Sequence, residues 1–369
     1  MERLAKLINP RTPAAEIAGI AARLGADSAA LIDLAADNHV TAPLSKNLIS
    51  KGAASLLTEE SRSQILDIPA ATTAMNIVLM KAAGDILAAA ADRGIDLLPL
   101  KGAALLGRAF SFDERQLTDI DFLCRREQLE QLNDTMTALG YEKSASCLPD
   151  EFAGDLSGEL KYISSVAGAT VEAEFQWEPV QGSAIGKAFP LTSEILWRFA
   201  TVRERRWSLA PEGEFLYHIF HFAIRHSFSR LQWLYDLDRM AEKSPPDWEK
   251  MPALLAETGL TRAAAHAFLA AGRLFGTETP PALKRIVVAE KNAEIVNHAV
   301  LAALSGNTLI KQSGVIPILL SENKLSFFFE YLFPPAEFLK KRYPGMPVPA
   351  AAFFRPFDLA SKLASKLRK

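Results

Sequence analysis

The sequence is poor in several residue classes, and each shortage excludes a class of protein. It contains only two cysteines in 369 residues, Cys124 and Cys147, with no CxxC spacing. Two cysteines in a chain of this length make neither a disulfide framework nor a zinc site. The net charge is only -2, which argues against the broad basic surface of proteins that bind long nucleic acids.

Long apolar runs are also missing. The first residues, MERLAKLINPRTPAAEIAG, lack the apolar segment of a signal peptide. The longest apolar runs, such as VIPILL and LSFFFEYLF, are shorter than a membrane span. We therefore expect a cytoplasmic protein with no transmembrane segment. The remaining composition is ordinary for a globular protein and can bury a substantial core.

The hydrophobic pattern divides the chain into three regions. Residues 1–70 show the i, i+3, i+4 apolar spacing of short helices, and a longer helix is expected over 71–93. Residues 71–185 hold the stretches with strand character. Residues 186–369 return to helices, the clearest of them over 214–243. We predict an α+β fold in which a small mixed sheet in residues 71–185 is flanked by helical regions at 1–70 and 186–369.

The predicted strands are short and separated by turn or helix signals. Glycines mark the ends of two helices, at Gly94 and Gly140. A strand-to-helix junction is expected at Lys101-Gly102, and a hairpin turn at Ala167-Gly168-Ala169. The expected strands cover residues 95–100, 117–124, 161–166 and 170–177.

Two aspartates, Asp119 and Asp121, interrupt the apolar run of the strand expected over 117–124. Residues two apart on a strand lie on one face, about 6.5–7 Å apart at their Cα atoms, so their carboxylates can converge on metal ions. A buried carboxylate is costly unless a cation meets it. Magnesium is typically held by a few carboxylates together with substrate phosphates. The pair therefore predicts a magnesium site that takes a phosphate-bearing substrate.

Such a site needs a third carboxylate and a phosphate-binding element, and the sequence has a candidate for each. The alternation of TVEAEFQW places Glu172 and Glu174 on one strand face. If this strand lies beside the first, Glu174 or Glu172 faces the same cleft. At the Lys101-Gly102 junction, the glycine lets the backbone approach a phosphate and the helix start favours an anion. Lys101 and Arg115 add positive charge there.

In this order, the residues resemble those of the nucleotidyltransferase superfamily, whose fold is that of the DNA polymerase β catalytic core. More narrowly, they resemble a large bacterial family of predicted nucleotidyltransferases that carry a KG(A/G)xxL…R…DID motif. The matching segments are LLPLKGAALL at 97–106, Arg115 and TDIDFL at 118–123. Helical segments such as LYHIFHFAIRH and LFPPAEFLKKRYPG also match, so the resemblance covers most of the chain.

The resemblance implies a transfer of a nucleoside monophosphate from a nucleoside triphosphate to a hydroxyl or phosphate acceptor. A small molecule, glycan precursor or peptide fits the acceptor better than long nucleic acid does. The third carboxylate in this superfamily commonly assists deprotonation of the acceptor hydroxyl. The implied catalytic residues and ligands of Mg²⁺ (or Mn²⁺) are Asp119, Asp121 and Glu174, and the implied nucleotide-binding residues are Lys101, Gly102, Ala103 and Arg115.

The sequence departs from the family pattern at two places, and these departures support an alternative. Ala103 stands where the wider superfamily usually has serine, and Glu174 and Gln176 replace an Asp and His pattern. The alternative is a catalytically impaired protein of this fold that serves as a nucleotide- or partner-binding subunit. A transferase of the toxin type, which modifies tRNA or protein, is a third possibility.

Two further groups of polar residues fall in the helical region 186–369. His218 and His221 are three apart and are predicted to share a helix face that packs on the core and lines an acceptor pocket, whereas His226 is rotated away. Asp236 and Asp238 form a second DxD, but residues two apart diverge on a helix. We therefore assign these two aspartates a structural role.

Overall fold

The strands that carry the predicted site form one mixed sheet, confirming the predicted α+β class. The computed structural model describes residues 1–144, 159–180, 183–203, 206–290, 293–306 and 315–367. The sheet has the order β1-β2-β5-β4-β3, in which β2 and β5 are parallel and the other neighbours are antiparallel. Its strands are β1 (Leu97–Leu100), β2 (Ile120–Cys124), β3 (Glu142–Lys143), β4 (Glu159–Val166) and β5 (Ala169–Gln176).

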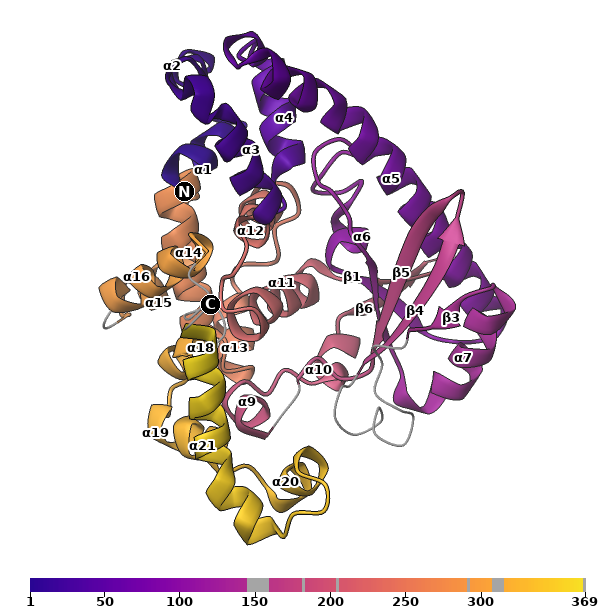
Figure 1. Ribbon diagram of the computed structural model, residues 1–369. Helices are drawn as coiled ribbons and strands as arrows, with labels where there is room; N and C mark the ends of the chain where they lie inside the picture. Colours follow the sequence, from indigo (N-terminus) through magenta and orange to yellow (C-terminus); the bar gives the residue numbers. More distant parts are fainter. Residues whose placement is uncertain (145–158, 181–182, 204–205, 291–292, 307–314, 368–369) are drawn as a thin grey trace.

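The chain is mainly helical up to β3, and two of its helices lie along one side of the sheet. In Figure 1 the long helix α5 and the shorter α7 run along the side of the sheet that faces away from the C-terminal helices. The short helix α6 leads directly out of β1. These helices are α1 (Glu2–Ile8), α2 (Ala14–Leu24), α3 (Ser28–Asp37), α4 (Thr41–Ser50), α5 (Glu59–Asp92), α6 (Lys101–Leu105) and α7 (Leu129–Ala138).

The chain after the sheet is mainly helical and forms the other side of the molecule in Figure 1. It begins with α9 (Ser183–Ala188), α10 (Ser193–Trp197), strands β6 (Ala200–Arg203) and β7 (Arg206–Leu209), α11 (Pro211–Ile219), a π-helix (Phe220–Arg225) and α12 (Leu231–Lys243). It continues with α13 (Met251–Glu257), α14 (Thr261–Phe275), α15 (Pro281–Val288), α16 (Ala293–Leu304), α18 (Val315–Leu320), α19 (Lys324–Leu332), α20 (Ala336–Arg342) and α21 (Val348–Leu367).

Several local predictions are wrong, and each has a physical reason. The two helices expected on either side of residue 70 form the single helix α5. The helix continues through Pro69 because residues before and after it, including Ile65 and Leu79, are buried in the same hydrophobic core. A hairpin, β6 with β7, stands in the region that was expected to be all helical. The helix expected over 214–243 is broken between the π-helix and α12.

Helix α5 is long and apolar enough to cross a membrane when judged by length and composition alone, a test that the core helix of a globular protein also passes. Its polar residue Asn76 is fully buried. The Asn76 amide donates to the backbone carbonyls of Phe112 and Arg115 at 2.7 and 2.8 Å, and its oxygen accepts from the backbone N–H of Leu117 at 3.0 Å. The helix therefore holds the loop that leads into β2.

Candidate functional site

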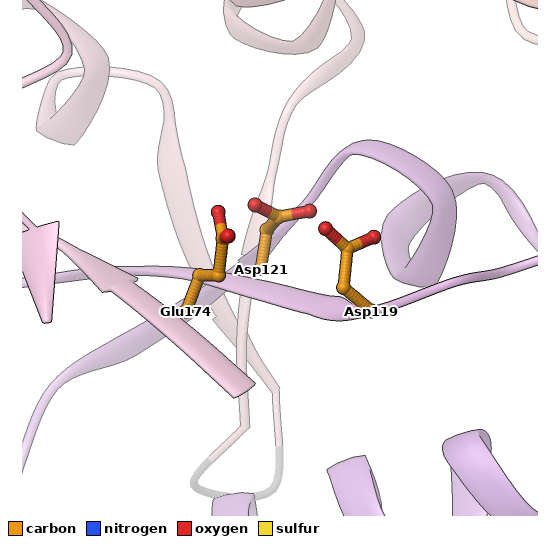
Figure 2. Close-up of side chains that lie close together, drawn as sticks. All are labelled: Asp119, Asp121 and Glu174. Atoms are coloured by element: carbon orange, nitrogen blue, oxygen red, sulfur yellow. The ribbon is translucent and has the colours of Figure 1, made fainter. Parts of the chain in front are cut away.

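Asp119, Asp121 and Glu174 converge at one place on the sheet (Figure 2). Asp121 lies in β2 directly beside Glu174 of the parallel strand β5. Asp119 precedes the first residue of β2, so the strand is shorter than its alternation predicts. One carboxylate oxygen from each residue lies within 4.8 Å of the others. The sheet register, not proximity in sequence, brings the third carboxylate to the pair, and it selects Glu174 over Glu172.

Two lysines meet these carboxylates. Lys101 directly follows β1, whose last residue lies opposite Asp121. Its Nζ forms an ion pair with Asp121 and lies 4.0 Å from Glu174. On the other side, Lys161 of β4 lies opposite Glu174 and forms an ion pair with it. The site therefore attracts cations, and in this structure two lysine ammonium groups pair with its carboxylates.

Burial and charge set the protonation of these groups. Asp121 is 2% exposed, and burial, with the charges of Asp119 and Glu174, raises its pKa to about 7 despite Lys101. Burial alone would raise the pKa of Glu174 as well, but Lys101 and Lys161 outweigh it and hold that pKa below its usual value. Burial lowers the pKa of Lys101, yet Asp121 outweighs this effect and the ammonium stays charged.

The Lys101-Gly102 junction is tightly built. Lys101 has a positive φ of 50°, a conformation that side-chain-bearing residues rarely adopt. A Cβ atom on Gly102 would lie 2.1 Å from Nη1 of Arg115 and 2.3 Å from Cδ2 of Leu117, so a larger residue would force these two side chains to move. Ala103 is buried directly behind Gly102 and offers no hydroxyl.

Arg115 lies beside Gly102, and its side chain is bonded to helix α12, which is distant in the sequence. Its Nε and Nη2 donate to the two carboxylate oxygens of Asp236 in α12, both at 2.9 Å, and both side chains are buried. Burial lowers the pKa of Arg115, but Asp236 outweighs this effect and raises it. The nearby Asp238 accepts from Arg11 at 2.5 Å and from Thr277 at 2.6 Å. Both aspartates of the second DxD thus have structural partners.

The carboxylates open onto a cavity of about 250 Å³ between the sheet and the helical region. The sheet side contributes the triad, the two lysines and Gly102. The helical side contributes His221, which was predicted to line an acceptor pocket. It also contributes residues that the sequence did not assign to the site, namely Arg225, His226, Arg230, Gln232 and Trp233.

The histidines are arranged differently from their predicted pattern. His218 bonds through Nε2 to the backbone carbonyl of Trp233 at 2.7 Å and faces a smaller, adjoining cavity. His221 lines the main cavity, as predicted for an acceptor pocket, but so does His226. The prediction that His226 is rotated away is therefore wrong, because it assumed 3.6 residues per turn through a segment that is a π-helix.

Gln176, where the family pattern has histidine, is fully buried in β5. Its Oε1 accepts a hydrogen bond of 2.8 Å from the hydroxyl of Tyr217. It is not among the described residues that line the cavity. This departure from the family pattern therefore lies behind the site and leaves the carboxylate positions intact.

The donor set fits a hard divalent cation. Three carboxylates present oxygen atoms close together, and Mg²⁺ and Mn²⁺ prefer oxygen ligands. Two of the three are nearly fully buried, at 2% for Asp121 and 7% for Glu174, and their charge is met by Lys101 and Lys161. The triad is compatible with the binding of a divalent cation.

The match to a protein family agrees with this chemistry. The profile of a family described as "Uncharacterised nucleotidyltransferase" matches residues 25–276, more than half of the chain and every residue that lines the cavity. Among curated proteins, none matches the sequence. Among solved structures, the crystal structure of JHP933 from Helicobacter pylori is similar at 14% identity and a TM-score of 0.31, covering 63% of this chain and 97% of that one. The chain therefore belongs to this uncharacterised nucleotidyltransferase family.

Proposed function

We propose that the protein is a Mg²⁺-dependent nucleotidyltransferase of the KG…DID type. It would transfer a nucleoside monophosphate from a nucleoside triphosphate to a hydroxyl or phosphate group of a small molecule, glycan precursor or peptide. The observation that carries the proposal is the meeting of Asp119, Asp121 and Glu174 within 4.8 Å at a cavity that also holds five cationic side chains. Those side chains are Lys101, Arg115, Lys161, Arg225 and Arg230.

In the proposed mechanism, Asp119, Asp121 and Glu174 hold the cation. A bound Mg²⁺ or Mn²⁺ supplies charge neutralisation at the phosphates and polarises the phosphoryl group. The backbone of Gly102, which lines the cavity, lies beside the phosphates, because a glycine lets the chain approach a ligand closely. Lys101 exchanges its contact with Asp121 for a phosphate oxygen, so its positive charge stays in the site throughout.

The acceptor oxygen attacks the α-phosphorus and forms a new P–O bond. The bond from the α-phosphorus to the bridging oxygen breaks, and pyrophosphate leaves with that electron pair. When the acceptor is a hydroxyl, its proton passes to the carboxylate of Glu174, which its lysine neighbours keep ionised. Most of the rate enhancement comes from positioning and fixed charge.

A labelling experiment tests the proposal. The protein is incubated with Mg²⁺, each α-labelled nucleoside triphosphate in turn and cell extract, and label transfer and pyrophosphate release are measured. The wild type is expected to transfer label, whereas the Asp119→Asn/Asp121→Asn double variant is expected to lose at least about 100-fold of the rate, since a metal contributes several kcal/mol. Asp134→Asn, an exposed aspartate in α7, is the matched control.

The competing function is a nucleotide- or partner-binding subunit without turnover. The ion pairs of Lys101 and Lys161 with the triad and the missing hydroxyl at Ala103 favour it. If the wild type transfers no more label than the double variant with any nucleotide, the enzyme proposal fails. Nucleotide binding by the same inactive wild type would then support the binding subunit.

A further inference from the structure

A π-helical turn builds the wall of the cavity that faces the triad. The backbone N–H of His226 donates to the carbonyl of His221, five residues earlier, at 3.1 Å. This i to i+5 bond is the mark of a π-helix, which is rare and frequent at functional sites. Because of it, the rings of His221 and His226 lie 4.4 Å apart. Trp233 of α12 completes the cluster, with its ring 5.0 Å from His221 and 4.7 Å from His226.

The turn after the π-helix is held in an unusual conformation. Ser227 and Phe228 have positive φ values of 48° and 55°, which cost free energy in residues other than glycine. The surroundings maintain them, since Phe228 is fully buried and its N–H donates to the carbonyl of Phe222 at 2.9 Å. The cluster is therefore formed in advance of any ligand.

His221 is the unsatisfied member of the cluster. It is 5% exposed, and neither ring nitrogen has a hydrogen-bond partner among the described residues. An unpaired buried polar group costs about 1–3 kcal/mol, so a ligand group is a natural partner. Burial, together with the charge of Lys101, lowers the pKa of His221 and keeps the ring neutral. A neutral imidazole has one N–H donor and one acceptor nitrogen, which match a hydroxyl group.

Arg230 supplies a cation beside the histidines. Its guanidinium lies over the Trp233 ring, 5.1 Å from the centroid. The neighbouring Arg225 forms an ion pair with Glu159 at 2.5 Å. Arg230 forms no direct ion pair within the described part of the chain, and the carboxylate charge that acts on it is that of Asp119. A guanidinium stacked on an aromatic ring is well suited to bidentate recognition of a phosphate.

The position of the cluster favours the acceptor over the nucleotide. In the proposed function the triphosphate binds at the Lys101-Gly102 junction, where Lys101 and Arg115 line the cavity on the sheet side. In phosphoryl transfer the attacking oxygen and the leaving oxygen lie roughly in line, so the acceptor must approach from a different side than the leaving pyrophosphate. The helical wall, with its hydroxyl-matching ring and its arginine, is such a side.

We propose that His221, His226, Arg230 and Trp233 form the acceptor subsite, and that the acceptor is a phosphorylated sugar or polyol. A hydroxyl of the acceptor bonds to His221 and its phosphate pairs with Arg230, while the ring or carbon chain lies against His226 and Trp233. This inference rests on the proposed function, because it assigns the second substrate of the same site.

Calorimetric titration tests the subsite without turnover. Ribose 5-phosphate and unphosphorylated ribose are titrated separately into wild-type protein that holds Mg²⁺ and a non-hydrolysable nucleoside triphosphate. Ribose 5-phosphate is expected to bind saturably and at least about tenfold more tightly than ribose, since a charge-assisted pair is worth more than a neutral hydrogen bond. Its addition is also expected to shift the imidazole NMR signals of His221 and His226.

Variants then assign the binding to the cluster. His221→Phe and Arg230→Gln are each expected to lower the affinity for ribose 5-phosphate by about tenfold. Each is expected to keep the affinity for the nucleotide within about twofold of the wild type. His221→Gln, which keeps a donor and an acceptor, is expected to retain most of the binding. Arg23→Gln, an exposed arginine of α2, is the matched control.

Three results would overturn the inference in distinguishable ways. If ribose 5-phosphate does not bind, or binds equally to the wild type and both variants, the subsite is wrong while nucleotide binding stands. If the variants weaken nucleotide binding instead, the cluster is part of the nucleotide-binding site. If the wild type binds no nucleotide in the presence of Mg²⁺, the proposed function itself fails and the subsite falls with it.

Discussion

Arg115 and Asp236, 121 positions apart in the sequence, are joined by two hydrogen bonds of 2.9 Å between buried side chains. Arg115 precedes β2 and its Nη1 lies against Gly102, whereas Asp236 belongs to α12, the helix that also carries Trp233. This single pair therefore fixes the sheet wall of the cavity to its helical wall.

Breaking this pair should destabilise the protein and loosen the site together. Asp236→Asn leaves the Arg115 guanidinium buried without its counter-charge, and removing one partner of a buried pair costs about 3–5 kcal/mol. We expect a loss of that size in the free energy of unfolding, measured by denaturant titration. Glu59→Gln, which removes an exposed partner of Arg62, should change it by less than about 1 kcal/mol. Equal losses in the two variants would show that the buried pair has no special role.

Gly102 should tolerate no side chain. In Gly102→Ala the new Cβ atom would meet Arg115 at 2.1 Å and Leu117 at 2.3 Å, so neighbouring groups must move at a cost of about 1–3 kcal/mol. We expect lower thermal stability and weaker nucleotide binding. Gly84→Ala, in the middle of α5 with open space around it, should be neutral or stabilising by up to about 1 kcal/mol. Unchanged nucleotide affinity in Gly102→Ala would contradict a phosphate-binding role for the junction.

Asn76 should be needed for the shape of the loop before Asp119. Its side chain makes three hydrogen bonds to backbone groups of residues 112–117, and Asn76→Ala leaves these groups without partners. We expect a loss of at least about 2 kcal/mol and faster hydrogen exchange in this loop, measured by mass spectrometry. Asn133→Ala, at a part-buried bond to Tyr162, is the comparison. Unchanged hydrogen exchange at residues 112–117 would show that the loop keeps its conformation without Asn76.

The stability of the protein should depend on pH through Glu214. Burial raises its pKa to about 7, because the ion pair with Arg108 only partly offsets the loss of solvation. An unfolded glutamate has a pKa of about 4.3, so the folded state binds the proton more tightly. The stabilisation from the protonated carboxyl is complete below about pH 4 and is lost as the pH rises through about 7.

Glu214→Gln removes this titration. Between pH 4 and pH 8 the wild type should lose up to about 3 kcal/mol relative to Glu214→Gln, as measured by urea unfolding at several pH values. Glu249→Gln, at an exposed glutamate, should follow the wild type at every pH. Parallel curves for the wild type and Glu214→Gln would mean that the carboxyl titrates normally.

Local patterns in the sequence predicted the fold class and the residues that converge in the site. The alternation around Asp119 and Asp121 and that around Glu174 are local properties of two strands, and the acidic residues were conspicuous in apolar surroundings. The α+β class followed from the same alternation between helical regions. Only the register of β2 beside β5 decided between Glu172 and Glu174, and register depends on tertiary packing.

The helical wall could not be predicted in the same way. The pairing of His221 with His226 depends on an i to i+5 turn, which has no sequence signature comparable to a helix cap. Lys161 was read only as part of a strand, because its contact with Glu174 arises from the β4–β5 register. The two helices expected on either side of residue 70 are the single helix α5, because burial of the turns that flank Pro69 keeps the helix continuous. The contact of Lys161 and the continuity of α5 are tertiary effects, whereas the pairing of the histidines follows from a local turn of the backbone.

The central claim is that the triad binds a metal ion together with a nucleotide, and one measurement tests it without knowledge of the acceptor. The affinity for a non-hydrolysable nucleoside triphosphate is measured by calorimetry with and without Mn²⁺, in the wild type and in Asp119→Asn/Asp121→Asn. We predict that Mn²⁺ strengthens binding to the wild type at least about tenfold and has little effect on the variant. An affinity that does not respond to Mn²⁺ in the wild type, or responds equally in the variant, would contradict the account.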